Sequence, residues 1–181
     1  MAKLTQRLGL TRYEADEAYK KALEAYNRRK LDEAIPAMDE AISLLPNSAE
    51  YYAARGFFHL EDNTDDKAQA DFEQALRVYP YEMLAHYGLG VIAYKAKNWD
   101  AAQTHFINAY KASPKRAETL YYLGLVYHRQ GQNGLAHTFM QQATTAFESA
   151  GDKKRGGDSG KWAKTLEKLA AEQAPKLPQG G

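Results

Sequence analysis

The chain has 181 residues, a length that fits one domain of ordinary size with a substantial buried core. Its 24 Lys and Arg side chains against 23 Asp and Glu side chains give a net charge of +1, so no global field draws it to nucleic acid or acidic membranes. With no cysteine, disulfides, Cys-ligated zinc, iron–sulfur clusters and thiol catalysis are excluded, which fits a reducing compartment.

The N-terminal stretch MAKLTQRLGLTRYEADEAYK contains basic residues and scattered leucines but no continuous apolar run. We therefore expect a soluble, cytoplasmic protein without an integral membrane segment. In residues 1–14, Leu4, Leu8 and Leu10 favour a short amphipathic element that caps the next segment. Docking into a neighbouring copy and binding to a membrane surface are the alternatives, and a segment this short gives little membrane affinity.

A period of 34 residues organises the chain from residue 15 to residue 150. Pro46, Pro80 and Pro114 follow this interval. Two series of alanines keep the same interval, and a large apolar residue stands between each pair, so that all three share one helix face. The three series are Ala34, Ala68, Ala102 and Ala136; Ala41, Ala75, Ala109 and Ala143; and Met38, Phe72, Phe106 and Met140.

The first half of each period carries a small residue at one position, where it allows two helices to approach closely. These residues are Ala22, Gly56, Gly90 and Gly124. The apolar runs around them, such as YYAARGFFHL and LYYLGLVYH, are separated by short polar links such as EDNTDDK. The spacing predicts two helices per period, with the proline stopping the second helix, and no strands.

This pattern resembles the tetratricopeptide repeat, a 34-residue helical hairpin with a small residue, two spaced alanines, an aromatic residue between them and a terminal proline. The resemblance covers four repeats, 15–48, 49–82, 83–116 and 117–150. Ala22 replaces the glycine in the first repeat and Glu148 replaces the proline in the last, as is common in terminal units. The resemblance to this repeat implies an all-α fold, a right-handed superhelical array of antiparallel hairpins known as an α-solenoid.

The resemblance also implies a concave groove lined by the first helices, where the fifth, ninth and twelfth residues of each repeat point inward. Nearly all of these residues are apolar or aromatic, which favours binding of an amphipathic helix or extended peptide. The alternatives are that the aromatic residues only pack adjacent helices, or that the chain's own termini fill the groove. The predicted groove residues are Tyr19, Leu23, Tyr26, Phe57, Tyr87, Val91, Tyr94, Tyr121, Leu125 and His128, with Ala53 and Leu60 at the remaining positions.

Among these residues Tyr19, Tyr87 and Tyr121 share one repeat position and are the expected anchors. Family members that hold the acidic tails of heat-shock chaperones use Lys, Asn and Arg at the fifth and ninth positions, and this chain lacks that clamp. Lys95 and Arg129, at the thirteenth position, are interpreted as solvated surface charges rather than as groups that steer an acidic partner.

Three local motifs suggest ligand chemistry and fail on their context. Gly88, Gly90 and Ala93 have dinucleotide-fingerprint spacing, but no strand is predicted before them. The stretch RGGDSGKW (155–162) lacks the first glycine and the Ser or Thr of a phosphate loop. The acidic turn at 62–73 has Lys67 where a calcium loop needs glycine. The histidines show no ligand spacing, so no catalytic, cofactor or metal site is predicted.

After the fourth repeat, residues 151–160 are rich in glycine and charge, and we expect a flexible linker there. Residues 161–175 place Trp162, Leu166 and Leu169 on one helical face, which predicts a helix that caps the array. Residues 176–181 are expected to be disordered.

The leading functional hypothesis is a non-enzymatic adaptor or assembly scaffold that binds another protein in the aromatic groove. The alternative is a self-assembling structural protein whose groove accepts a segment of another copy in a homo-oligomer. A cofactor-carrying enzyme has no support in the motifs, and the balanced charge disfavours RNA.

Overall fold

The structure is a computed structural model that describes the backbone of residues 2–173 and the side chains of residues 9–173. Within residues 2–173 all regular structure is helical and no strand occurs. The end of the expected cap and the expected tail, residues 174–181, lie outside the described residues. The helices are α1 (Ala2–Asn27), α2 (Leu31–Leu44), α3 (Ala49–Glu61), α4 (Asp65–Val78), α5 (Met83–Lys95), α6 (Trp99–Ala112), α7 (Ala117–Arg129), α8 (Asn133–Ser149) and α9 (Lys153–Gln173).

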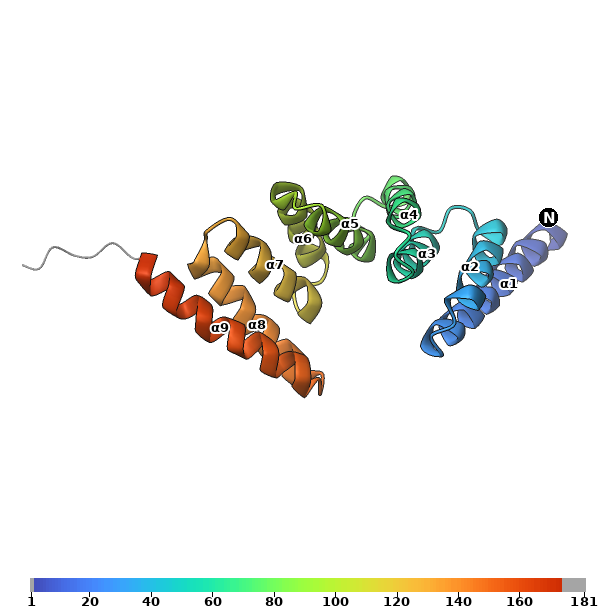
Figure 1. Cartoon of the computed structure of the whole chain (residues 1–181). Helices are drawn as coiled ribbons and strands as arrows, with labels where there is room; N and C mark the ends of the chain where they lie inside the picture. Colours follow the sequence, from blue (N-terminus) through green and yellow to red (C-terminus); the bar gives the residue numbers. More distant parts are fainter. Residues whose placement is uncertain (1, 174–181) are drawn as a thin grey trace, which may run out of the picture. The chain divides into compact units, whose positions relative to one another are not determined.

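The chain divides into two compact units, residues 1–92 and residues 93–181. In the N-terminal unit α1 packs against α2, and α3 packs against α4 (Figure 1). In the C-terminal unit α8 packs between α7 and α9 (Figure 1). The first residues of α3, α5 and α7 are 34 positions apart, as are those of α2, α4, α6 and α8. This register confirms the all-α fold of helical hairpins that the sequence predicts.

The turn inside each hairpin is closed by one residue in the left-handed conformation. Arg29, Asn63, Lys97 and Gly131 occupy equivalent positions and have φ values of 60°, 58°, 58° and 76°. The amide of the next residue then reaches back into the first helix, as in the 2.8 Å bond from Gln132 N–H to the Tyr127 carbonyl. This closure satisfies carbonyl groups at the helix end and reverses the chain.

The prolines end the second helices, as the sequence predicts. Helices α2, α4 and α6 stop two residues before Pro46, Pro80 and Pro114. The intervening residue leaves the helical region, as Ser113 does with φ −144° and ψ 85°, because the proline ring disfavours a helical residue before it. Helix α8 meets Glu148 instead of proline and continues to Ser149.

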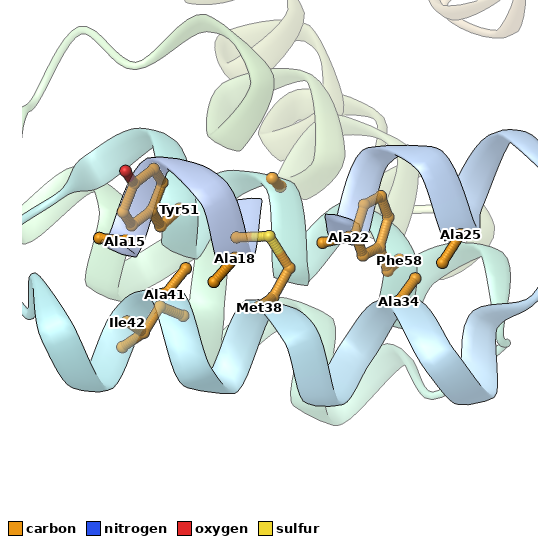
Figure 2. Packing of buried hydrophobic residues seen from close by; sticks show 11 residues of the cluster. Ala15, Ala18, Ala22, Ala25, Ala34, Met38, Ala41, Ile42, Tyr51 and Phe58 are labelled. Carbon is orange, nitrogen blue, oxygen red and sulfur yellow. The ribbon is translucent and has the colours of Figure 1, made fainter. Parts of the chain in front are cut away.

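The core is built from the small and large residues of the repeat. Met38, Phe72, Phe106 and Met140 are fully buried, together with the alanines on either side of them. Each such large side chain contributes on the order of 1.5–3 kcal/mol by leaving water. Figure 2 shows the N-terminal example, in which alanines of α1 face α2 and two aromatic residues of α3 complete the cluster. Its labelled members are Ala15, Ala18, Ala22, Ala25, Ala34, Met38, Ala41, Ile42, Tyr51 and Phe58.

Glycines allow the first helices to lie close to the large core residues. A Cβ atom at Gly56 would lie 2.8 Å from the Phe72 ring, and one at Gly124 would lie 3.0 Å from the methyl group of Met140. These contacts confirm the predicted packing role of the small residue in the second and fourth repeats. At Gly88, a Cβ atom would overlap the opposite edge of the Phe72 ring. Two glycines from successive first helices therefore enclose one phenylalanine.

The N-terminal segment 1–14 does not form a separate element. Its backbone from Ala2 onward continues directly into the first helix of repeat one, and α1 runs to Asn27. Leu10 and Tyr13 remain 58% and 62% exposed, so both side chains lie largely at the surface.

The prediction of a flexible linker at 151–160 is wrong, because α9 begins at Lys153. Asp152 caps the helix by accepting a 2.9 Å bond from the Arg155 amide. Gly156, Ser159 and Ala163 are buried along one side of α9, and Thr144 of α8 donates a 3.0 Å bond to the Ser159 hydroxyl. Small residues three and four positions apart thus form a packing surface rather than a hinge.

Candidate functional site

The first helices of the N-terminal unit bring several predicted groove residues together. Tyr26 of α1 stacks on Phe58 of α3 with 4.8 Å between ring centroids and meets Phe57 edge-on at 5.9 Å. Tyr19 lies 5.0 Å from the Tyr51 ring, one to two turns away on the same pair of helices. The aromatic residues therefore join α1 to α3, which is the packing role that the sequence analysis set beside partner binding.

The predicted groove residues of this unit differ in accessibility. Tyr19, Tyr26 and Phe57 are half-buried and Leu23 is 37% exposed, so each keeps surface that a partner can cover. Tyr87 is only 8% exposed and Val91 9%, so these two belong mainly to the core. Ala53 and Leu60 are also buried. We therefore place the candidate surface of this unit on Tyr19, Leu23, Tyr26 and Phe57 and call it the N-terminal aromatic face.

Two tyrosine hydroxyls on these helices are engaged by carboxylates of the same unit. Tyr19 Oη donates to Glu50 Oε1 at 3.0 Å, and Tyr51 Oη donates to Asp16 Oδ1 at 2.7 Å. Burial and then the Glu50 charge raise the pKa of Tyr19 far above its ordinary value. Burial and the bond to Asp16 raise the pKa of Tyr51 to about 12. Both hydroxyls stay protonated at neutral pH, and their donor capacity is used within the chain.

In the C-terminal unit, predicted residues from two repeats meet around Tyr122. Tyr94 lies edge-on to Tyr122 at 5.5 Å and to Trp99 at 5.3 Å, and Tyr121 lies 6.1 Å from Tyr122. Tyr122 itself stacks on the buried Phe106 at 5.0 Å. Tyr94, Tyr121 and Leu125 are half-buried. Burial, followed by the charges of Tyr94 and Asp158, raises the pKa of Tyr121.

The chain's own last helix contacts one of the predicted groove residues of the fourth repeat. Trp162 of α9 lies 5.7 Å from the ring of His128, the predicted residue at the twelfth position. His128 Nδ1 also makes a 2.7 Å hydrogen bond with Asn133 Oδ1. Trp162 remains 37% exposed and so extends the aromatic surface while it covers His128.

Residue-by-residue reading of the groove positions misses Tyr122, Trp99 and the carboxylates of Asp16 and Glu50. Tyr122 directly follows the predicted Tyr121. It stacks on Phe106 and makes edge-to-face contacts with Tyr94 and Tyr121. The signal for the carboxylates is an acidic residue at the second position of repeats one, two and four (Asp16, Glu50 and Glu118), which a search for apolar anchors ignores.

The motifs that suggested ligand chemistry lie within helices and turns. Gly88 is in the middle of α5 against Phe72, and most of the 155–162 stretch faces α8 or solvent as part of α9. Asn63 and Thr64 of the acidic turn close the α3–α4 hairpin. Among the described residues no group of three or more His, Asp and Glu side chains is placed to hold a metal ion, and none of the helices is long and apolar enough to span a bilayer.

A hollow of about 1180 Å³ lies in the C-terminal unit along α8 and α9. Its wall includes Lys115, His137, Gln141, Thr145 and Lys164. None of the predicted groove residues lines it, because it follows the second helix of the repeat.

Part of the chain matches a known protein family. A family model described as tetratricopeptide repeat matches residues 81–149. Anaphase-promoting complex subunit 3 of Schizosaccharomyces pombe is 28% identical over 102 residues. That match covers 56% of this chain and only 15% of the yeast protein.

Solved structures with low sequence identity share the fold. A structure from a study of Pseudomonas aeruginosa pilF has a TM-score of 0.70 at 16% identity and covers 92% of this chain and 79% of its own. MamA from Desulfovibrio magneticus RS-1 has a TM-score of 0.62 at 19% identity, with 90% and 98% covered. The first tetratricopeptide domain of Spaghetti (RPAP3), bound to the HSP90 peptide SRMEEVD, has a TM-score of 0.61 at 15% identity, with 66% and 94% covered.

The family match lies on residues 81–149, and the same 34-residue register of helix starts, hairpin turns and buried alanines extends through the N-terminal half. The fold is that of modules whose usual work is protein–protein interaction rather than catalysis. Residues 81–149 match the tetratricopeptide repeat, and the fold of the chain is that of a solved tetratricopeptide domain.

Proposed function

We propose that the protein is a non-enzymatic adaptor or assembly scaffold that binds a peptide or helix of another protein on the first-helix surfaces of its repeats. The observation that carries this proposal is the N-terminal aromatic face, where Tyr19, Leu23, Tyr26 and Phe57 are held by neighbouring helices yet keep accessible surface. Rigid aromatic side chains bury much area at low entropic cost when a partner covers them.

The C-terminal unit adds Tyr94, Tyr121, Leu125 and Trp162 as a second surface of the same composition. A partner that places two or three apolar anchors on such surfaces gains roughly 1.5–3 kcal/mol for each buried side chain. After the costs of ordering and association, affinities near the micromolar range are expected. The balanced composition supports a protein partner rather than a nucleic acid.

Exchange of the exposed apolar side chains tests the proposal. We expect the double variant Leu23→Ser and Tyr121→Ala to lose partners that co-purify with the tagged wild-type protein, measured by mass spectrometry of the bound fraction. The matched control is Leu135→Ser, which removes a 47% exposed leucine from α8, a second helix. Retention of the same partners by a correctly folded double variant would contradict the proposed surface.

Self-assembly is the second candidate function, and one observation favours it. Leu10 and Tyr13 are exposed near the start of α1, where they offer an apolar contact to another copy. If this contact forms, the solution mass exceeds that of the 20.3 kDa chain and returns to it in the variant Leu10→Ser, Tyr13→Ser. Light scattering during gel filtration measures both masses.

A further inference from the structure

Carboxylates gather around the tyrosines of the N-terminal aromatic face. Glu50 accepts the Tyr19 hydroxyl at 3.0 Å and Asp16 accepts the Tyr51 hydroxyl at 2.7 Å. Glu82 adds to the negative field at Tyr19, and Glu61 does the same at Tyr26. These groups come from α1, from both ends of α3 and from the loop before α5. The face is therefore acidic as well as aromatic.

Three basic side chains of this unit, Arg28, Lys30 and Arg55, pair with other carboxylates. Arg55 donates to Asp39 at 2.7 Å and to both oxygens of Asp71 at 2.6 and 2.8 Å, which ties it to α2 and α4. Arg28 and Lys30 both pair with Glu33 in the first hairpin turn. Arg12 lowers the pKa of Tyr51 and Arg29 lowers that of Tyr26, so each partly offsets the negative field there.

The two units also differ in their total charge. Residues 1–92 contain 11 Lys and Arg against 16 Asp and Glu, whereas residues 93–181 contain 13 against 7. The near-neutral total therefore hides an acidic N-terminal unit and a basic C-terminal unit. An acidic unit attracts basic segments over roughly one Debye length, about 8–10 Å at ordinary salt, and repels acidic ones.

We infer that the N-terminal aromatic face binds a basic amphipathic helix of another protein. Apolar residues of that helix cover Leu23, Tyr26 and Phe57, while its Lys and Arg side chains lie against Glu50, Glu61 and Glu82. Aromatic rings attract cations through their faces, and the adjacent carboxylates form ion pairs with Lys and Arg. The rings and the carboxylates of this face therefore both favour a basic helix. This inference rests on the proposed function and names the chemistry of the partner.

The test uses two synthetic amphipathic helices with identical apolar residues, one with lysine and one with glutamate at every charged position. Fluorescence anisotropy with the full chain measures both affinities at low and moderate salt. We expect the basic helix to bind about tenfold more tightly or better, with an advantage that shrinks as salt rises. Equal affinities, or tighter binding of the acidic helix, would overturn the inference.

A charge-neutralised variant locates the binding surface. We expect Glu50→Gln, Glu61→Gln and Glu82→Gln together to remove most of the preference for the basic helix. The matched control Glu40→Gln, Asp66→Asn and Glu73→Gln removes the same charge from exposed positions on the second helices α2 and α4 and keeps the preference. An equal loss in both variants means that net charge alone attracts the peptide, and it refutes a dedicated face.

Two further outcomes are distinguishable. If the Leu23→Ser, Tyr121→Ala variant loses its native partner while the two peptides bind equally, the proposed function stands and the basic partner is wrong. If the wild type forms a dimer that the basic helix dissociates and that Leu10→Ser, Tyr13→Ser abolishes, the occupant is the start of α1 of a second copy, and a separate partner protein is wrong.

Discussion

At the scale of single residues, the structure assigns opposite roles to glycines that look alike in the sequence. Gly56 and Gly88 enclose the Phe72 ring, and Gly124 admits Met140. Gly134 and Gly157 also lie in helices, but open space surrounds the position of a Cβ atom at both. The neighbouring side chains therefore leave no room for a Cβ atom at Gly56, Gly88 and Gly124, whereas Gly134 and Gly157 have room for one.

This contrast predicts stability changes of opposite sign. Gly88→Ala should lower the free energy of unfolding by about 1–3 kcal/mol, because its methyl group overlaps Phe72. Gly157→Ala should raise it by roughly 0.5–1 kcal/mol, because alanine favours the helix and meets nothing. Urea denaturation of both variants measures the difference. A Gly88→Ala variant as stable as the wild type would show that the helices move apart without cost.

His59 gives the N-terminal unit a pH dependence on the acid side. It is 8% exposed, and burial lowers the pKa of its ring. The Thr64 hydroxyl donates its hydrogen to the His59 carbonyl. In the 3.0 Å contact between His59 Nδ1 and Thr64 Oγ1, the ring N–H is therefore the donor and the hydroxyl oxygen is the acceptor. Asp71 and Asp39 favour a charged ring, whereas Arg55 and Lys67 oppose it.

Because the pKa is lower in the folded state, the folded chain favours the neutral ring. This contribution is complete above the unfolded value of about 6.5 and is lost as the pH falls through the lower folded value. We expect the melting temperature to fall between pH 7.5 and 5, and to fall less in His59→Ala because this variant lacks the titrating ring. The repeat accommodates alanine at this position, as Ala25 and Ala93 show at the matching positions of repeats one and three. Equal pH dependence in both proteins would contradict this role.

At the scale of elements, the hairpin turns depend on one left-handed residue each. Arginine, asparagine, lysine and glycine all occur at this position, although only glycine adopts it without steric cost. Tertiary packing of the two helices therefore holds the other residues in a conformation that they rarely choose alone.

The turn of the fourth repeat tests this cost. Gly131→Ala should destabilise the protein by about 1–2 kcal/mol, because φ at this position is 76°. Gly131→Asn should cost less, since Asn63 occupies the equivalent turn at 58°. Thermal unfolding followed by circular dichroism ranks the two variants, and equal losses would show that side-chain size rather than φ sets the cost.

Helix α9 is the element that the sequence analysis divides wrongly. The glycines at 156, 157 and 160 are typical of a flexible segment, yet two of them face the neighbouring helix. Gly156 lies against Glu148 and Gly160 against Thr144. Glycine disfavours an isolated helix by about 1 kcal/mol per residue, and close packing against α8 offsets that cost because no side chains keep the helices apart.

At the scale of the whole molecule, stability in a repeat array is approximately a sum of terms from each repeat and its sequence neighbours. Both tryptophans, Trp99 and Trp162, belong to the C-terminal unit, and tryptophan fluorescence therefore reports that unit alone. Far-ultraviolet circular dichroism reports helices of both units.

The two signals predict where a substitution acts. Gly88→Ala lies in the N-terminal unit, so we expect it to lower the denaturation midpoint measured by circular dichroism more than the midpoint measured by tryptophan fluorescence. The control Gly157→Ala lies in the C-terminal unit and should move the fluorescence midpoint most. Identical shifts of both signals would show a single cooperative transition along the chain.

The sequence by itself determined the repeat, its helical hairpins and its core, because a period of 34 residues with small and large residues on one helix face has one compact solution. Met38, Phe72, Phe106 and Met140 are all buried as that period requires. Tertiary structure decided which groove positions remain accessible. Leu23 stays at the surface and Tyr87 becomes part of the core, although the repeat pattern predicts that both point into the groove. It also decided that the start of α9 is helical and that carboxylates surround Tyr19 and Tyr51. Periodicity fixes the direction of a side chain on its own helix, but exposure and electrostatic environment depend on neighbours that only the folded chain brings together.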